Sequence, residues 1–209
     1  VLLADSTGIP LERRGASADD TTFELWGLWP GAVWSEDSEG TNGIGTCLVE
    51  QRTLTIDREQ HFFTRNTAMS CTTAPLFDHE GKLAGALDVS SCRADLTDAF
   101  AALISFAVSD AACRIETENF RRVYAKERVV IVPGEDRAAL LAIDADDRIV
   151  GATRAARRTF DLNAEKLSKG VAASTLIGSE EGSRADFENA ARRVVLNALT
   201  FSLDPGASL

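Results

Sequence analysis

The sequence predicts an α+β fold: helices packed on an antiparallel sheet, then a smaller α/β segment and a C-terminal helix. Three observations carry this prediction. Residues 70–90 hold two strand-like runs on either side of the polar turn "DHEGK", which is the usual pattern of a β-hairpin. Residues 96–125 repeat apolar side chains at helical spacing. Short apolar runs return after Arg128, where we expect further strands.

The first 50 residues predict two strands, a long loop and a short helix. "VLLAD" and "IPLERR" flank the turn signal "DSTG", so they read as strand, turn and strand. From residue 27 to 45 the chain has five glycines, a proline and two tryptophans. Loops of this length are usually functional or disordered, and the tryptophans indicate that this one packs over something. "GIGTCLVEQ" then predicts two helical turns capped by Thr41 or Asn42.

The next elements are a short strand at "LTI", a small helix at "DREQHFFTRN" capped by Asp57, and the hairpin. A turn centred on residues 79–80 would pair Leu76 with Leu83 and Cys71 with Asp88. Since side chains alternate faces along a strand, one face is apolar and is expected to meet the long helix: Leu83, Leu87 and Val89. The other face is small and partly polar, and it presents Asp88.

A long helix is predicted to follow from about residue 96 to 125, capped by Asp95, with a continuous apolar stripe. Beyond Arg128, "VVIV", "ALLAID" and "DDRIVGAT" read as short strands and "RAARRTFDL" as a short helix. A polar linker, "GSEEGSR", precedes a final helix, "DFENAARRVVLNAL".

Composition excludes several classes of function. The 209 residues are 44% hydrophobic, which fits one or two globular domains. A net charge of -10, from 22 basic and 32 acidic residues, disfavours general binding to nucleic acid or to an anionic membrane. No apolar run reaches the length of a membrane span. The four cysteines are widely spaced without a CxxC pair, which favours a reducing cytoplasm. Because the chain starts at Val1 inside a strand-like run, we expect it to be part of a longer protein.

Several blocks together resemble a known family. "WSEDSEGTNGIGTCL", "HFF", "CTTAPLFDHEGKLAGALDVS" and the long helix resemble the GAF sensory domain of acetoin-type, sigma-54-dependent, Fis-family bacterial transcriptional activators. The resemblance covers residues 1–127. Residues 128–178 are similar to a PAS-like segment, and residues 179–209 to a linker and the start of a Fis-type helix-turn-helix. No phosphate-loop motif GxxxxGK[ST] occurs, so we expect either a sensory fragment or a shorter relative that lacks the family's central ATPase domain. The second helix of the helix-turn-helix is also missing, so contact with DNA and RNA polymerase is expected only through domains absent from this chain.

The resemblance and the hairpin pattern together predict an effector pocket on the second face of the hairpin. A small neutral metabolite (a hydroxyketone, alcohol, ketone or phenol-like compound) is expected there, because such pockets combine apolar walls with a few convergent polar groups. No basic residue lies in "EGTNGIGTCL", which disfavours a phosphate ligand. We expect no cofactor, and a homodimer formed through the long helix. The candidate ligand-binding residues are Trp34, Thr46, Cys47, His61, Phe62, Cys71, Thr73 and Asp88.

Each candidate also has a purely structural interpretation. In that interpretation, Asp88 accepts hydrogen bonds from loop amides and has no ligand. Trp34 and the cysteines fill the core, and His61 lies on a helix surface. Catalysis is not expected, because only two histidines occur and no motif pairs either with a nucleophile. Two alternatives stay open: a non-haem iron held by Asp88, Cys71, Cys47 and His61, and a module with a filled cavity that responds to a partner protein.

Overall fold

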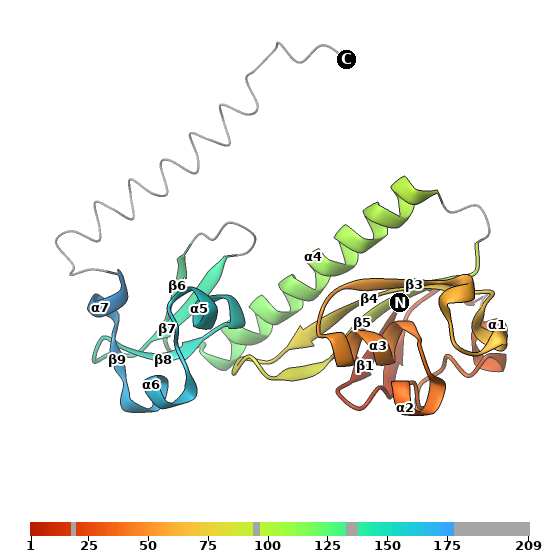
Figure 1. The fold of residues 1–209 in the computed structure, drawn as a ribbon. Coiled ribbons are helices and arrows are strands. Elements are labelled where there is room, and N and C mark those ends of the chain that lie inside the picture. Colours follow the sequence, from red (N-terminus) through yellow and green to blue (C-terminus); the bar gives the residue numbers. More distant parts are fainter. Residues whose placement is uncertain (18–19, 94–96, 133–137, 178–209) are drawn as a thin grey trace, which may run out of the picture.

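The computed structural model describes residues 1–17, 20–93, 97–132 and 138–177, and these form two antiparallel sheets (Figure 1). The first sheet has the strand order β2-β1-β5-β4-β3. Each neighbouring pair in it is antiparallel, as the hairpin pattern predicts. Its strands are β1 (Leu2–Asp5), β2 (Pro10–Arg13), β3 (Leu54–Asp57), β4 (Ser70–Phe77) and β5 (Leu83–Ser91).

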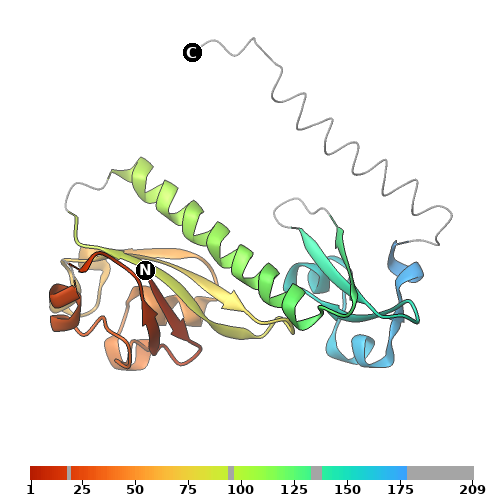
Figure 2. The ribbon, with the colours of Figure 1, turned by 180° about the vertical axis from the view of Figure 1, so that it is seen from behind.

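Helices cover both faces of this sheet. The long helix α4 (Asp98–Val123) lies on one face, and the short helix α3 (Gly43–Glu50) lies on the other (Figures 1 and 2). Leu87 and Val89 pack with Val108 and Ala112 of α4, so the expected contact between the apolar hairpin face and the long helix is confirmed for these two residues. Two shorter helices, α1 (Asp20–Leu25) and α2 (Glu36–Glu39), belong to the loop before α3.

The ends of both helices can be explained from their capping residues. Asn42 caps α3, because its side-chain oxygen accepts a hydrogen bond from Gly45 N at 2.8 Å, and this confirms one of the two predicted caps. The cap of α4 is Thr97, whose hydroxyl accepts from Phe100 N, and the helix starts at Asp98. The expected cap, Asp95, lies outside the described residues, as does the predicted C-terminal helix.

The expected small helix at "DREQHFFTRN" is wrong. This segment forms two separate 3₁₀ turns, η2 (Arg58–Gln60) and η3 (Thr64–Asn66). Arg58 has a positive φ of 42°, which departs from helical geometry. The Gln60 side chain accepts a hydrogen bond from Asp57 N, so the first turn is bonded to the residue that precedes it. His61 and Phe63 then have extended backbones. We call residues 58–69 the β3–β4 loop.

The predicted hairpin is present, but its register differs from the expected one. Asp88 pairs with Thr73, whereas Cys71 was expected, and an irregularity between Leu76 and Phe77 pairs Phe77 with Leu83. A shift of two residues keeps the faces of the strands unchanged, except near the turn. There the irregularity moves Leu83 away from the α4 side, and Leu83 packs with the cluster beneath α3.

The second sheet has the order β6-β7-β8-β9 and carries the strands and the short helix predicted for this region. Its own core contains Leu141, Ile143 and Ile149. It adjoins the C-terminal end of α4 (Figure 1), where Phe120 packs against Leu140 and Ala142. Its elements are β6 (Arg128–Val132), β7 (Ala139–Ile143), β8 (Arg148–Ala152), β9 (Val171–Ala172), α5 (Arg154–Thr159), α6 (Ala164–Lys169) and α7 (Ala173–Ile177).

The turn of the hairpin also touches this second unit. The guanidinium of Arg154, on α5, lies 3.8 Å from the centre of the Phe77 ring. The ring of His79 meets the ring of Tyr124 edge-on, with 5.9 Å between the centroids. Within the described residues, none of the helices has both the length and the apolar character needed to cross a membrane.

Candidate functional site

Asp88 lies at the centre of the candidate site, buried in the middle of the first sheet. It is 1% exposed. Its register partner Thr73 donates a hydrogen bond to Oδ1 at 2.5 Å, and the Ser90 hydroxyl donates to Oδ2. The same Ser90 oxygen lies 3.2 Å from Cys71 Sγ. The second face of the hairpin therefore has a small polar group (Cys71, Thr73, Asp88 and Ser90) inside an apolar layer.

Burial shifts the titration of the groups in this layer. It raises the pKa of the Asp88 carboxyl above its ordinary value, although hydrogen bonds from Ser90 and Thr73 oppose the shift. Burial, reinforced by the nearby Asp88 charge, raises the pKa of Cys47 to about 12 and that of Cys71 well above 9.0. Both thiols are therefore protonated at neutral pH, a form that is not nucleophilic.

The first turn of α3 forms the roof over this polar group. A Cβ added at Gly43 would lie 2.6 Å from Cys71 Cβ, 2.8 Å from Thr73 Oγ1 and 3.1 Å from Asp88 Oδ1. Such distances leave room only for glycine. The glycine-rich stretch thus lets the α3 backbone lie directly on the sheet, as no larger residue could.

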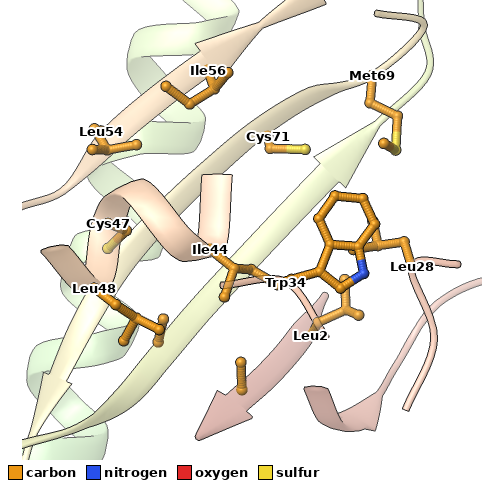
Figure 3. Packing of buried hydrophobic residues seen from close by; sticks show 12 residues of the cluster. Leu2, Leu28, Trp34, Ile44, Cys47, Leu48, Leu54, Ile56, Met69 and Cys71 are labelled. Carbon is orange, nitrogen blue, oxygen red and sulfur yellow. The ribbon is translucent and has the colours of Figure 1, made fainter. Parts of the chain in front are cut away.

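Apolar side chains pack around this roof. Trp34 is buried with Leu28, Ile44 and Cys47 in the cluster between α3 and the strands (Figure 3). Its indole N–H donates to Gly27 O at 2.7 Å, so the buried ring has its polar atom satisfied. The long aromatic loop therefore covers the sheet, as its tryptophans indicated.

Two of the eight candidates, Thr46 and Phe62, lie outside the buried layer around Asp88. Thr46 is on α3, but its hydroxyl donates to Glu36 Oε1 at 2.7 Å and accepts from Asn42 N, so it ties α3 to α2. Phe62 is 69% exposed and covers Gly40 from outside. Six candidates remain buried: Trp34, Cys47, His61, Cys71, Thr73 and Asp88.

The β3–β4 loop contributes two buried polar side chains with unused hydrogen-bonding atoms. His61 is 4% exposed, so a surface position for it is excluded. Its Nε2 has no partner, and neither does Oδ1 of the fully buried Asn66. Asn66 was not among the candidates, because its segment was expected to be a small helix. Only the folded loop shows that it is buried.

The donors expected for an iron site do not come together. Within the part of the chain that the structure describes, no three His, Cys, Asp or Glu side chains are placed to hold a metal ion. The structure thus offers no support for the iron alternative.

A five-stranded antiparallel sheet with a long helix on one face and a small polar group under short helices on the other is the architecture of a sensory α+β domain. The GAF domain family model matches residues 1–115. The chain belongs to the GAF domain family.

Among curated proteins, it is 33% identical over 163 residues to the acetoin catabolism regulatory protein of Cupriavidus necator. That match covers 75% of this chain and 24% of the relative. It is also 33% identical over 89 residues to the acetoin dehydrogenase operon transcriptional activator AcoR of Bacillus subtilis. This second match covers 43% of this chain and 15% of AcoR. The chain therefore spans about a quarter of the length of the first relative and a smaller part of the second. These similarities support the resemblance to acetoin-type activators.

Among solved structures, the chain is similar to the Escherichia coli DhaR(N)–DhaL complex, with a TM-score of 0.49 and 18% identity. That match covers 90% of this chain and 65% of the other.

Proposed function

We propose that this chain is the cytoplasmic effector-sensing region of a bacterial transcriptional activator. A small neutral metabolite, such as a hydroxyketone, alcohol, ketone or phenol-like compound, binds between α3 and the first sheet. The names of two relatives refer to acetoin, which is itself a hydroxyketone, and this supports the choice of class. DNA and RNA polymerase are contacted through domains outside this chain.

The observation that carries the proposal is the polar group around Asp88, enclosed by apolar side chains. A sheet interior filled only for stability needs no carboxylate, because burying one costs free energy unless it is hydrogen-bonded. Here the carboxylate is kept by Thr73 and Ser90, and an unpartnered His61 Nε2 is buried in the loop beside α3. A few polar groups inside an apolar enclosure are what a small-molecule site requires.

Binding needs α3 to lift from the sheet, since Gly43 lies directly against Cys71, Thr73 and Asp88. A ligand favours such an opened state only through its higher affinity for that state. The movement is passed through β4 and β5 to α4, which packs on the opposite face of the same strands.

A homodimer through α4 completes this proposal. The N-terminal half of α4 exposes large apolar side chains at successive helical turns, namely Phe100, Leu103 and Phe106. Leu103→Glu is expected to convert a dimer into a monomer in light scattering at micromolar concentration. Leu25→Glu, at an 80% exposed position on α1, is the matched control. A monomeric wild type, or a dimeric Leu103→Glu variant, contradicts the α4 interface.

The binding proposal is tested by a thermal-shift screen with small hydroxyketones, alcohols, ketones and phenols. We expect at least one class to raise the melting temperature in a concentration-dependent way. The variant Thr73→Val removes the hydroxyl that Asp88 accepts from and should abolish the shift. Thr55→Val, on the neighbouring strand β3 and bonded to Thr72, is the control that should retain it.

A second candidate function, a module that responds to a partner protein, is favoured by one observation. The cluster beneath α3 fills the space over the sheet with the chain's own side chains. If no compound in the screen raises the melting temperature and a crystal structure shows the same filled interior, this candidate replaces the first. Stoichiometric iron in anaerobically purified protein would displace both.

A further inference from the structure

Arg13 places a largely buried cation on the same sheet face as the candidate site. Its register partner on β1 is Leu2, and Leu2 is in turn the partner of Asp88 on β5. Partners in antiparallel strands carry their side chains on the same face, so Arg13 faces the α3 side, two strands or about 10 Å from Asp88. The side chain of Arg13 is only 9% exposed. A guanidinium buried this far requires partners nearby.

The partners of Arg13 come from α1 and from the loop that follows it. Its Nη1 forms an ion pair with Asp20, the first residue of α1. Its Cζ lies 5.2 Å from the centre of the Phe23 ring on α1 and 5.2 Å from that of the Trp29 ring in the loop. Both distances are within the range of a cation–π contact. A single side chain therefore fastens α1 to the sheet and to Trp29.

The segment of residues 20–26 has few other attachments. Its helix α1 contains no buried residue, and residues 14–17, which precede it, are all exposed. Phe23 and Trp26 pack against the cluster beneath α3 but are only partly buried. Within the described residues, the ion pair with Arg13 is the polar contact that ties this segment to the sheet.

Gly27, directly after this segment, has the properties of a hinge. Its φ is +73°, and a Cβ built on it would meet no atom of the described residues within 4 Å, so its backbone can rotate without a clash. One backbone hydrogen bond crosses it, from Leu28 N to Phe23 O at 2.9 Å. The Gly27 carbonyl also accepts from Trp34 Nε1 at 2.7 Å. A rotation at Gly27 therefore withdraws the partner of the buried indole.

We propose that residues 20–26 are a lid over the β1–β2 side of the candidate site, fastened by Arg13 and hinged at Gly27. This inference rests on the proposed function, because it assigns the route by which the effector enters. When the lid opens, Trp34 loses its acceptor, and the cluster that Trp34 shares with Cys71 becomes accessible to small molecules (Figure 3). Opening of the lid admits the effector, and lifting of α3 then makes room for it.

The test measures how often the lid opens in the ligand-free full chain. Cys71 is 3% exposed, so iodoacetamide alkylates it only when the segments that cover it move aside, and mass spectrometry of the peptide that contains Cys71 gives the rate. Arg13→Met removes the charge and both ring contacts, and we expect the rate to rise by about tenfold. Arg13→Lys keeps the charge without the planar guanidinium and should give an intermediate rate. Arg14→Met, at a side chain that is 83% exposed, is the matched control and should leave the rate unchanged.

Urea separates opening of the lid from unfolding of the whole domain. A lid exposes little surface when it opens, so the labelling rate of Cys71 should depend on urea far less steeply than global unfolding does. An unchanged rate in a folded Arg13→Met protein, or a urea dependence equal to that of global unfolding, overturns the lid. If Arg13→Met does not fold, Asp20→Asn takes its place, because the Asp20 side chain is 39% exposed and both rings stay on Arg13. We expect a rise of about threefold in that variant.

The same assay distinguishes the lid from the proposed function. An excess of 3-hydroxybutan-2-one, a small hydroxyketone, should slow the labelling of Cys71 in the wild type, because the bound compound lies beside the thiol. Labelling that rises in Arg13→Met but is slowed neither by 3-hydroxybutan-2-one nor by any other compound of the screen supports the lid and contradicts the proposed function. Protection by 3-hydroxybutan-2-one together with an unchanged rate in Arg13→Met supports the proposed function and overturns the lid.

Discussion

Gly43→Ala tests whether the first turn of α3 lies directly on the polar group of the sheet. The added methyl carbon would meet Cys71 Cβ at 2.6 Å and Thr73 Oγ1 at 2.8 Å, where ordinary contacts between carbon atoms are about 3.5–4.0 Å. Neither neighbour can turn aside cheaply, because both belong to β4, an interior strand of the sheet. The helix therefore has to move outward by up to about 1 Å.

The expected cost follows from two opposing terms. Overpacking a well-packed interior costs about 1–3 kcal/mol. Replacing glycine by alanine in a helix returns about 0.5–1 kcal/mol. We therefore expect the free energy of unfolding to fall by about 0–2.5 kcal/mol, centred near 1 kcal/mol, which for a chain of this size lowers the melting temperature by up to about 10 °C.

Urea denaturation and calorimetry measure this change. Val49→Ala is the control, because Val49 is on the same helix and 65% exposed, and we expect it to change stability by less than about 0.5 kcal/mol. A Gly43→Ala protein more stable than the wild type by about 0.5–1 kcal/mol, the gain expected without a clash, would refute the close seating of α3. It would also remove the need for the helix to lift when a ligand binds.

Three further substitutions test other parts of the structure. Burial raises the pKa of Asp88 above 3.8, so the folded state binds this proton more tightly than the unfolded state. The contribution of Asp88 to stability should therefore fall as pH rises from about 4 through the raised pKa. Asp88→Asn should flatten that fall in denaturation curves measured across this range, and an unchanged slope would contradict the assignment. Phe120→Ala empties a fully buried position against Leu140 and Ala142 and should cost about 3–5 kcal/mol in urea unfolding; a loss below about 1 kcal/mol would mean that the two units do not share this contact. Asn42→Ala removes the cap of α3 and should cost about 1 kcal/mol, and a thermal melt identical to the wild type would argue against the cap.

Most secondary-structure elements could be predicted, because their signals are local. The cap at Asn42, the long helix, the hairpin and the strands after Arg128 each follow from a short pattern of residues. The hairpin register could not be predicted. It depends on the irregularity between Leu76 and Phe77, and nothing in the sequence "PLFDHEGKLAG" indicates on which side of the turn the extra residue falls.

The candidate site was predictable to the extent that strand alternation fixes which side chains share a face. Cys71, Thr73 and Asp88 share one, as predicted, because a shift of two residues leaves the faces unchanged. Thr46 and Phe62 depend on how α3 and the β3–β4 loop sit on the sheet, which is a tertiary property. Asn66 was missed for the same reason, since only the packing of the loop buries it.

The contact between the hairpin turn and α5 determines how the two sheets can move. The chain joins them once through α4, whose C-cap residue Tyr124 meets His79 of the hairpin turn. The stacking of Arg154 on Phe77 joins them a second time through space. The two sheets are thus connected at two places, so a rotation about the end of α4 would have to break the contact between Arg154 and Phe77. A change in the spacing of β4 and β5 would therefore reach α5 through Phe77 at the end of β4 as well as through α4.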